Sequence, residues 1–163
     1  MKITDDLVLF FGNKDVCSNF YLCPLQYDGH KFHSSEQLFM YLKAKEFKDE
    51  VTMNEILKCK TPREAKALGR KVKNYDDKVW DIRRDSCMYI TILTKFIQCK
   101  EFRQILKDNH NKRFAEASPY DSIWGIKLSE NDSRALDLSQ WKGENRLGEC
   151  INKLISNYYD ILY

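Results

Sequence analysis

The feature that most constrains the fold is a long amphipathic segment over residues 78–98. Its large apolar residues Trp80, Met88, Ile92 and Phe96 are separated by multiples of four. Residues four apart lie on the same side of an α-helix, so this spacing indicates one helix with a single buried stripe. We therefore expect the longest helix of the chain in this segment.

Helix-start signals predict five shorter helices. Ser34 and Gln37 match the capping box, Thr61 and Glu64 match it again, and Asp49 is a candidate N-cap. The predicted ranges are 34–46, 49–58, 61–72, 101–107 and 145–160.

Short apolar runs beside turn residues predict the strands, and Asp28-Gly29 is a typical hairpin turn between two of them. The expected extended segments are 7–11, 25–27, 31–33, 114–117 and 123–128. Together the elements predict an α+β fold, a mainly helical single domain over residues 1–163 with a small β-sheet of about three to five strands.

Composition excludes several classes of protein. The 163 residues carry a formal net charge of +3, which by itself does not indicate nucleic-acid binding. No apolar run approaches the ~20 residues of a membrane span, and no cationic leader opens the chain, so we expect a cytoplasmic protein without membrane contact. The six cysteines are scattered without metal-ligand spacing. We therefore expect free thiols and no metal or other cofactor.

Four groups of residues can carry chemistry, and the first is Glu36 with Lys43. Seven residues are close to two helical turns, so both side chains lie on one face of the predicted helix, about 10 Å apart along its axis. A carboxylate and an amine facing one pocket can perform acid–base or nucleophilic catalysis. The alternative is an ordinary helix, in which a glutamate near the start favours the helix dipole.

The second group lies on the long helix, with Trp80, Arg83 and Arg84 near its start and Lys95 near its end. Arginine can grip a diphosphate with two N–H groups, and tryptophan can stack on a base. The alternative is a core tryptophan on an amphipathic helix with a solvated basic face.

The third group surrounds a loop broken by proline after Ser118. Carboxylates at Glu116 and Asp121 flank this loop, and two carboxylates can stabilise an oxocarbenium-like ribosyl centre or activate water. Gly125, next to Trp124, can let a ligand approach the backbone. The alternative is that Asp121 only forms a turn.

The fourth group is Asn145 at the start of the last helix. A helix start offers free backbone N–H groups that can bind a phosphate or a ribose hydroxyl. The alternative is that Asn145 only caps the helix.

Taken in order, these segments resemble the NADAR (YbiA-like) family over about residues 10–155. The matching positions are Ser18-Asn19-Phe20, Ser35-Glu36-Gln37, Phe39, Lys43-Ala44, Leu68-Gly69-Arg70, Trp80, Lys95-Phe96, Glu116-Ala117-Ser118-Pro119, Asp121, Trp124-Gly125, Trp141, Gly143, Asn145 and Leu147-Gly148. The chain departs from the family at Lys127, where the family usually has glycine.

The resemblance implies a compact, mainly helical α+β fold and an N-glycosidase. Known members cleave the base–ribose bond of early riboflavin-pathway intermediates or remove ADP-ribose from guanine in nucleic acids. The family's motif lysine falls on Lys43 and its motif glutamate on Glu36. In the second kind of member such a lysine is thought to form a Schiff base with C1 of the opened ribose.

On this resemblance we expect Lys43, Glu36 and Asp121 to be catalytic. The expected substrate-binding residues are Asn19, Phe20, Arg70, Trp80, Arg83, Lys95, Glu116, Ser118, Trp124, Gly125, Asn145, Leu147 and Gly148. The expected partner of this monomer is ADP-ribosylated guanine in DNA or RNA, or a nucleotide-like small molecule. The alternatives are an N-glycosidase of riboflavin biosynthesis intermediates, a non-catalytic module that binds ADP-ribose or NAD, and an interaction protein without a ligand.

Overall fold

The computed structural model describes the backbone of residues 1–162 and the side chains of residues 1–160. The chain divides into two compact units. Unit 2 is the continuous segment Asn19–Cys99, and unit 1 combines Met1–Ser18 with the chain from Lys100 onward.

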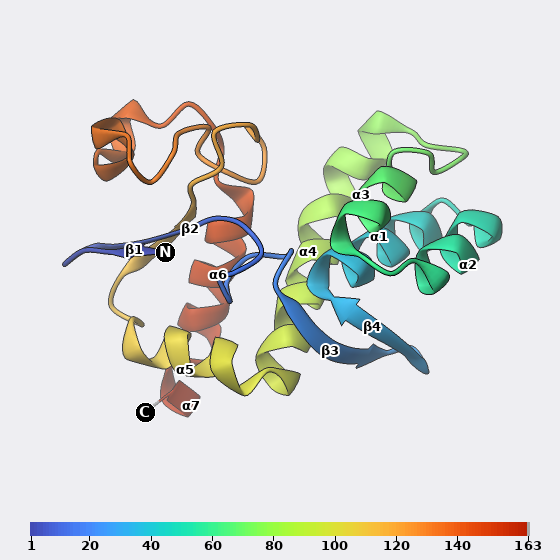
Figure 1. The fold of residues 1–163 in the computed structure, drawn as a ribbon, viewed down its shortest axis with the longest axis horizontal. Coiled ribbons are helices and arrows are strands. Elements are labelled where there is room, and N and C mark those ends of the chain that lie inside the picture. Colours follow the sequence, from blue (N-terminus) through green and yellow to red (C-terminus); the bar gives the residue numbers. More distant parts are fainter. Residues whose placement is uncertain (163) are drawn as a thin grey trace. The chain divides into compact units, whose positions relative to one another are not determined.

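Unit 2 is built around one central helix (Figure 1). Helix α1 (Ser35–Glu46) contacts α2 (Glu50–Lys58), α3 (Pro62–Gly69) and α4 (Asp77–Gln98), and also the hairpin of β3 (Leu22–Tyr27) and β4 (His30–Ser34). Nine of its twelve residues are consequently buried, Glu36 among them. The carboxylate-bearing residue Glu36 is thus buried by the elements that surround α1.

The start of α1 is fixed by two side chains. The N–H of Gln37 donates to Oγ of Ser34 at 3.2 Å, as the capping box predicts. Gln37 reaches back one residue further than in that motif, because its Oε1 accepts from the N–H of His33 at 2.7 Å. Its Nε2 also donates to the carbonyl of Ile56 at 2.8 Å, which ties α1 to α2.

Helix α4 confirms the prediction from the apolar spacing. It spans 22 residues, and Trp80, Met88, Ile92 and Phe96 are all buried. Helix α3 is shorter than expected and ends at Gly69 instead of residue 72. Glycine is a poor helix former, but a Cβ at this position would lie 1.9 Å from Sδ of Met40, so a larger residue would force the Met40 side chain to move where α3 packs on α1.

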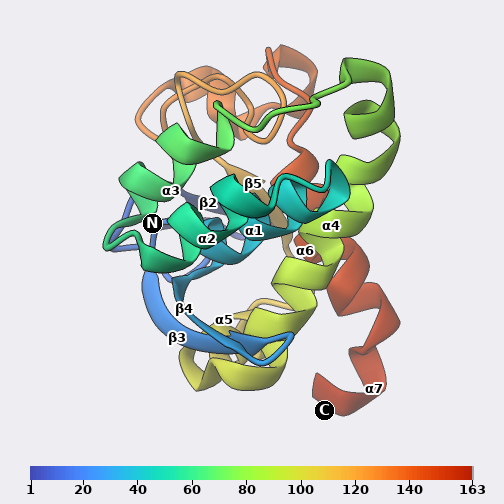
Figure 2. The same cartoon turned by 90° about the vertical axis from the view of Figure 1, so that its right-hand side faces the viewer.

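Unit 1 contains a three-stranded sheet in the order β1 (Lys2–Ile3), β2 (Leu7–Phe10), β5 (Arg113–Glu116). Strand β1 is antiparallel to β2, and β5 is parallel to β2, with Leu7 opposite Arg113 and Phe10 opposite Glu116. Two helices of this unit are α5 (Lys100–Asp108) and α6 (Arg146–Asn157), and α6 packs along β5 (Figure 2).

Two predictions for unit 1 are wrong. Residues 123–128 form no strand, although Ile126 and Leu128 do belong to a buried apolar cluster with β2 and β5. Backbone groups of this segment bond instead to β5 and to the start of α6. The last helix is interrupted at Tyr158, after which the short α7 (Tyr159–Leu162) follows. The 3₁₀ turns η1 (Ser133–Leu136) and η2 (Leu138–Gln140) precede α6.

The fold class is confirmed as α+β and mainly helical with little β-structure. The strands form two separate small sheets, because β3 and β4 pair only with each other among the described residues. The single-domain organisation over residues 1–163 stays a prediction.

Candidate active site

In unit 2 the first candidate group forms around α1. Glu36, in the first turn of α1, is 7% exposed. Its backbone N–H donates to the carbonyl of Asn19 at 3.0 Å, and Oγ of Ser35 donates to the same carbonyl at 3.4 Å. Lys43 lies two turns further along the same helix and is half-buried. The helix therefore carries both reactive groups on one rigid support.

The amine of Lys43 lies between two aromatic rings. Its Nζ is 4.8 Å from the ring centroid of Tyr75 and 5.7 Å from that of Trp80. Tyr75 is exposed and precedes α4, whereas Trp80 is buried in the first turns of α4. Aromatic faces attract the ammonium form, so the rings hold the lysine head in place.

Several charges act on the same amine. Burial lowers the pKa of Lys43 from its usual value. The Glu36 carboxylate opposes this effect, and the positive charges of Arg70 and Arg84 lower the pKa further. The structure thus brings Glu36, Arg70 and Trp80 into the surroundings of Lys43, and the roles of these residues at a site stay predictions.

Arg84, which the sequence offered without assigning it a site role, faces this group. Its side chain is 14% exposed and forms an ion pair with Asp81. Its Nε is buried and has no hydrogen-bond acceptor among the described residues. Arg83, which was assigned to the site, pairs instead with Glu46 at 3.1 Å. Helical spacing explains why the two arginines differ. Arg84 is four residues after Trp80, so it lies on the apolar stripe of α4 that Trp80 begins, whereas Arg83 lies beside that stripe.

Asn19 and Phe20 enter unit 2 beside the start of α1. Asn19 is 6% exposed, and its Nδ2 donates to Sδ of Met88 at 3.4 Å. Its Oδ1 is buried and accepts no hydrogen bond within the described part of the chain. A buried polar atom without a partner is costly, so this oxygen is suited to a ligand donor or an ordered water molecule. Phe20 contacts Nζ of Lys66, 5.7 Å from its ring centroid.

Lys95 does not join the Lys43 group. It is fully buried on α4, with Nζ 5.7 Å from the ring centroid of Tyr21. Fifteen residues of helix separate it from Trp80, which corresponds to about 22 Å along the axis. The two ends of the α4 stripe therefore have different surroundings.

The third candidate group lies in unit 1, on the loop after β5. Oγ of Ser118 accepts from the N–H groups of Tyr120 and Asp121. Oδ1 of Asp121 accepts from the N–H groups of Ile123 and Trp124 at 2.9 and 2.8 Å. Both side chains thus fold the loop, which is the turn role that the sequence left open. Oδ2 of Asp121 makes no hydrogen bond among the described residues, so one carboxylate oxygen remains for chemistry.

Asn145 has a different role from the one expected. It precedes α6 with φ 54°, and its side chain makes no capping hydrogen bond. Instead Oδ1 accepts from the N–H of Glu116 at 3.0 Å, and Nδ2 donates to the carbonyl of Phe114 at 3.1 Å. Asn152, two turns along α6, accepts from the N–H of Phe114 at 2.9 Å. The two asparagines therefore satisfy backbone groups of Phe114 and Glu116 along the edge of β5 that pairs with no other strand of the described residues.

The amides at the start of α6 are not free for a phosphate. The N–H groups of Asn145, Arg146 and Leu147 donate to the carbonyls of residues 125, 123 and 124 at 3.0–3.1 Å. This is the physical reason why residues 123–128 do not form a strand. The anion-binding interpretation of these amides is therefore wrong, because the loop of the protein itself occupies them.

Two glycines of this unit are explained by close packing within the chain. A Cβ at Gly148 would lie 2.3 Å from the carbonyl oxygen of Phe114, so glycine lets α6 approach the edge of β5. A Cβ at Gly125 would lie 2.9 Å from the carbonyl oxygen of Glu116.

Among the other predicted binding residues of this unit, Leu147 is buried, whereas Trp124 and the Glu116 side chain are half-buried. Ligand contacts of these residues stay predictions.

Tyr75 is the residue near Lys43 that the sequence analysis missed. It lies outside every helix and motif, and only its position five residues before Trp80 links it to the site.

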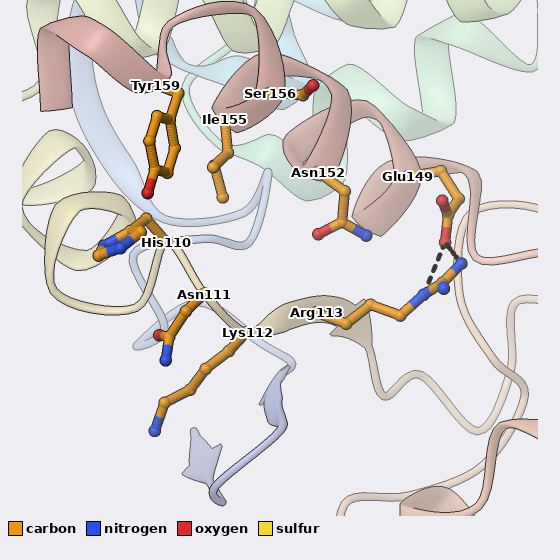
Figure 3. A pocket seen from close by; sticks show the side chains of 9 residues that line it. All are labelled: His110, Asn111, Lys112, Arg113, Glu149, Asn152, Ile155, Ser156 and Tyr159. Atoms are coloured by element: carbon orange, nitrogen blue, oxygen red, sulfur yellow. Dashed lines mark hydrogen bonds and ion pairs between the residues drawn. The ribbon is translucent and has the colours of Figure 1, made fainter.

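A separate hollow of about 390 Å³ lies in unit 1 between the 110–113 segment, α6 and Tyr159 (Figure 3). None of the predicted site residues lines it. Arg113 and Glu149 face each other there as an ion pair.

The described residues contain no group of three or more side chains suited to hold a metal ion. Among the described helices, none has the length and apolar content needed to span a bilayer.

Comparisons with known proteins agree with this architecture. A family model described as the NADAR domain matches residues 9–156. Protein irg-1 of Caenorhabditis elegans is 36% identical over 93% of this chain and 79% of its own. N-glycosidase R617 of Acanthamoeba polyphaga mimivirus is 32% identical over 76% of this chain and 73% of its own.

N-glycosidase YbiA of Escherichia coli is 28% identical over 92% of this chain and 87% of its own. The NMR structure of the E. coli protein YbiA has a TM-score of 0.77 and 26% identity, and the match covers 98% of this chain and 89% of that one. Several relatives are thus named N-glycosidases, which supports hydrolysis of an N-glycosyl bond as the class of activity.

Proposed function

Because this chain belongs to the NADAR domain family, we propose that it is an N-glycosidase that removes ADP-ribose from guanine in DNA or RNA. The observation that carries the proposal is the environment of Lys43, a half-buried amine with a lowered pKa beside a buried carboxylate and two aromatic rings. An amine attacks carbon only after it loses its proton, so a lowered pKa makes this lysine a usable nucleophile.

The proposed reaction passes through a Schiff base. Nζ of Lys43 forms a bond to ribose C1 while the C1–O4 bond breaks, and O4 takes up a proton. The C1–N bond to guanine then breaks, guanine leaves with a proton, and lysine remains as the imine of the opened ribose. Water adds to C1, the C1–Nζ bond breaks, and ADP-ribose leaves as the aldehyde, which closes to the ring. The sum is one water consumed per N-glycosyl bond.

The carboxylates supply the proton transfers in this scheme. Glu36 lies on the same helix as Lys43 and moves the proton between the amine and O4. Asp121 uses its Oδ2 to bind the ribose hydroxyls or to activate the water, while its Oδ1 keeps the loop folded. We prefer guanine in nucleic acid as the leaving group because the stretch Glu116–Pro119 resembles family members that reverse ADP-ribosylation, and the mild net charge of +3 is compatible with a polyanion.

The direct test is release of ADP-ribose from an oligonucleotide that carries ADP-ribosylated guanine, followed by mass spectrometry. We expect wild-type protein to release ADP-ribose and Lys43→Ala to be slower by at least about a thousand-fold. Lys45→Ala is the matched control on the same helix, because Lys45 is exposed and pairs with Asp28. This control should keep full activity.

Undiminished hydrolysis by Lys43→Ala would contradict the Schiff-base mechanism. If the wild type leaves the oligonucleotide intact but cleaves the base–ribose bond of a riboflavin-pathway intermediate, the substrate assignment is wrong and the second candidate replaces it. Salt separates the two substrates independently, since binding to nucleic acid weakens steeply as salt rises.

A further inference from the structure

Two aromatic side chains in unit 1 lie exposed where two parallel strands end. Strands β2 and β5 run side by side, with Phe10 opposite Glu116 at their carboxyl ends. Phe11 follows β2 directly, and the loop with Tyr120 and Asp121 follows β5. The carboxyl ends of parallel strands are the usual place for a ligand beside a sheet. The aromatic residues thus lie on the same strand ends as Asp121, the carboxylate of unit 1 that is proposed to be catalytic.

The two rings contact each other and are open to solvent. Their centroids are 6.4 Å apart with an angle of 51° between the ring planes. Tyr120 is 85% exposed and Phe11 is 43% exposed. Single exposed apolar residues are common, but two exposed aromatic rings in contact offer a surface that can take up another flat ring.

The backbone beneath this pair is held by side-chain hydrogen bonds. The N–H of Phe11 donates to Oδ2 of Asp15 at 2.9 Å, and Asp15 in turn binds the amino terminus. The N–H of Tyr120 donates to Oγ of Ser118 at 3.3 Å, beside that of Asp121. The same short turn therefore fixes the backbone of Tyr120 and of Asp121, so little backbone freedom is lost when a ligand stacks there.

We propose that Phe11 and Tyr120 form a stacking platform for a nucleobase that neighbours the modified guanine in single-stranded nucleic acid. This inference rests on the proposed function, and it narrows the substrate class to an unpaired polynucleotide. Stacking on exposed aromatic rings needs a splayed base, which a duplex does not offer. The adenine of the ADP-ribosyl group is present in a modified mononucleotide and in a modified oligonucleotide alike, whereas only the oligonucleotide has a neighbouring base to place on the platform.

The test compares one modified guanine in two contexts, as a free ADP-ribosylated mononucleotide and within a single-stranded oligonucleotide. For Tyr120→Ala we expect KM for the oligonucleotide to rise between about five-fold and a hundred-fold. The increase for the mononucleotide should be at least five times smaller. Phe11→Ala should act in the same direction, and Tyr120→Phe, which keeps the ring, should restore the wild-type KM. Tyr159→Ala, at another exposed tyrosine of unit 1, is the matched control and should leave KM unchanged for both substrates.

Binding of a fluorescent unmodified single strand, followed by anisotropy, keeps this inference separate from the proposed function. If wild type cleaves neither substrate, the proposed function fails, but weaker binding by Tyr120→Ala than by Tyr159→Ala still supports the platform. Equal losses on both substrates would overturn it, as would unchanged KM and unchanged anisotropy in Tyr120→Ala, or wild-type binding that is equally tight to a duplex.

Discussion

The two units treat their polar site residues in opposite ways. In unit 2, Nε of Arg84 and Oδ1 of Asn19 are buried without hydrogen-bond partners in the described chain. On the loop of unit 1, Ser118, Asp121 and Asn145 all bond to backbone groups. Unit 2 therefore holds groups whose electrostatic state suits chemistry, whereas unit 1 uses most of its polar groups to keep a loop and a helix in place.

The comparison shows that residues of one family motif need not share one kind of role. Asn145 and Gly148 match the motif as well as Lys43 does, yet their contacts explain their identity without a ligand. Asp121 folds the loop through Oδ1, and its Oδ2, which makes no hydrogen bond among the described residues, carries the proposed chemical role. The predictions below separate structural from chemical roles in the two units.

The largest effect on stability is expected at Asn145. Asn145→Ala leaves the N–H of Glu116 without its acceptor and places alanine at a positive φ. We expect the free energy of unfolding to fall by about 3 kcal/mol, measured by urea denaturation at an unchanged m-value. Asn131→Ala, at an exposed position of unit 1, should change it by less than about 0.5 kcal/mol. A stable but inactive Asn145→Ala protein would instead make Asn145 a ligand residue.

Asp121 separates the two roles within one side chain. Asp121→Asn keeps the Oδ1 acceptor for the amides of Ile123 and Trp124 but removes the charge. We expect kcat to fall by roughly 10- to 100-fold with a stability change below about 0.5 kcal/mol, measured by steady-state kinetics and urea denaturation. Asp121→Ala removes the charge and the Oδ1 acceptor, so it should lower both kcat and the free energy of unfolding. Full activity in Asp121→Asn would reduce this residue to a turn former.

The pH dependence tests the electrostatics of unit 2. In the proposed mechanism Lys43 reacts as the neutral amine, so kcat/KM should rise with pH to a plateau, with a midpoint below the usual lysine pKa of 10.5. Glu36 raises the pKa of Lys43, so Glu36→Gln should move the midpoint to lower pH. Arg84 lowers this pKa, so Arg84→Gln should move it to higher pH. Shifts in the same direction in both variants would contradict the assigned environment.

The smallest effect concerns two strained lysines, one in each unit. Lys127 in unit 1 and Lys48 in unit 2 both have φ 55°, a conformation that favours glycine. Lys127→Gly and Lys48→Gly should each raise the free energy of unfolding by about 1 kcal/mol in urea denaturation. A loss of stability at both positions would show that the lysine side chains make contacts that outweigh the strain.

Local signals in the sequence predicted most of unit 2. The caps at Ser34, Asp49 and Thr61 and the apolar stripe of α4 depend only on neighbouring residues, and the structure confirms all of them. Unit 1 was harder because β2 pairs with β5, about a hundred residues away in the chain. The apolar segment around Ile126 is buried, but only the tertiary structure shows that its carbonyls are used by α6.

For the candidate site, too, the sequence predicted neighbours within one helix but not neighbours brought together by tertiary packing. Glu36 and Lys43 are two turns apart on one helix, so spacing alone placed them together. Tyr75 and Arg84 join them only through tertiary packing. The position of Asn145 before a helix predicts a cap, but its side chain bonds to β5 instead, which only the tertiary structure shows. At each of these three positions the residue type indicates a polar contact, but it does not show which group the side chain contacts.

The central claim is that Lys43 forms a covalent bond to ribose C1 during the reaction. Borohydride reduces an imine to a stable secondary amine, so wild-type protein incubated with ADP-ribosylated guanine and borohydride should gain the mass of a reduced ADP-ribosyl group. Peptide mapping should place this mass on Lys43, and Lys43→Ala should gain none. Turnover of the substrate by wild type without any trapped adduct, or with an adduct on another lysine, would contradict the account.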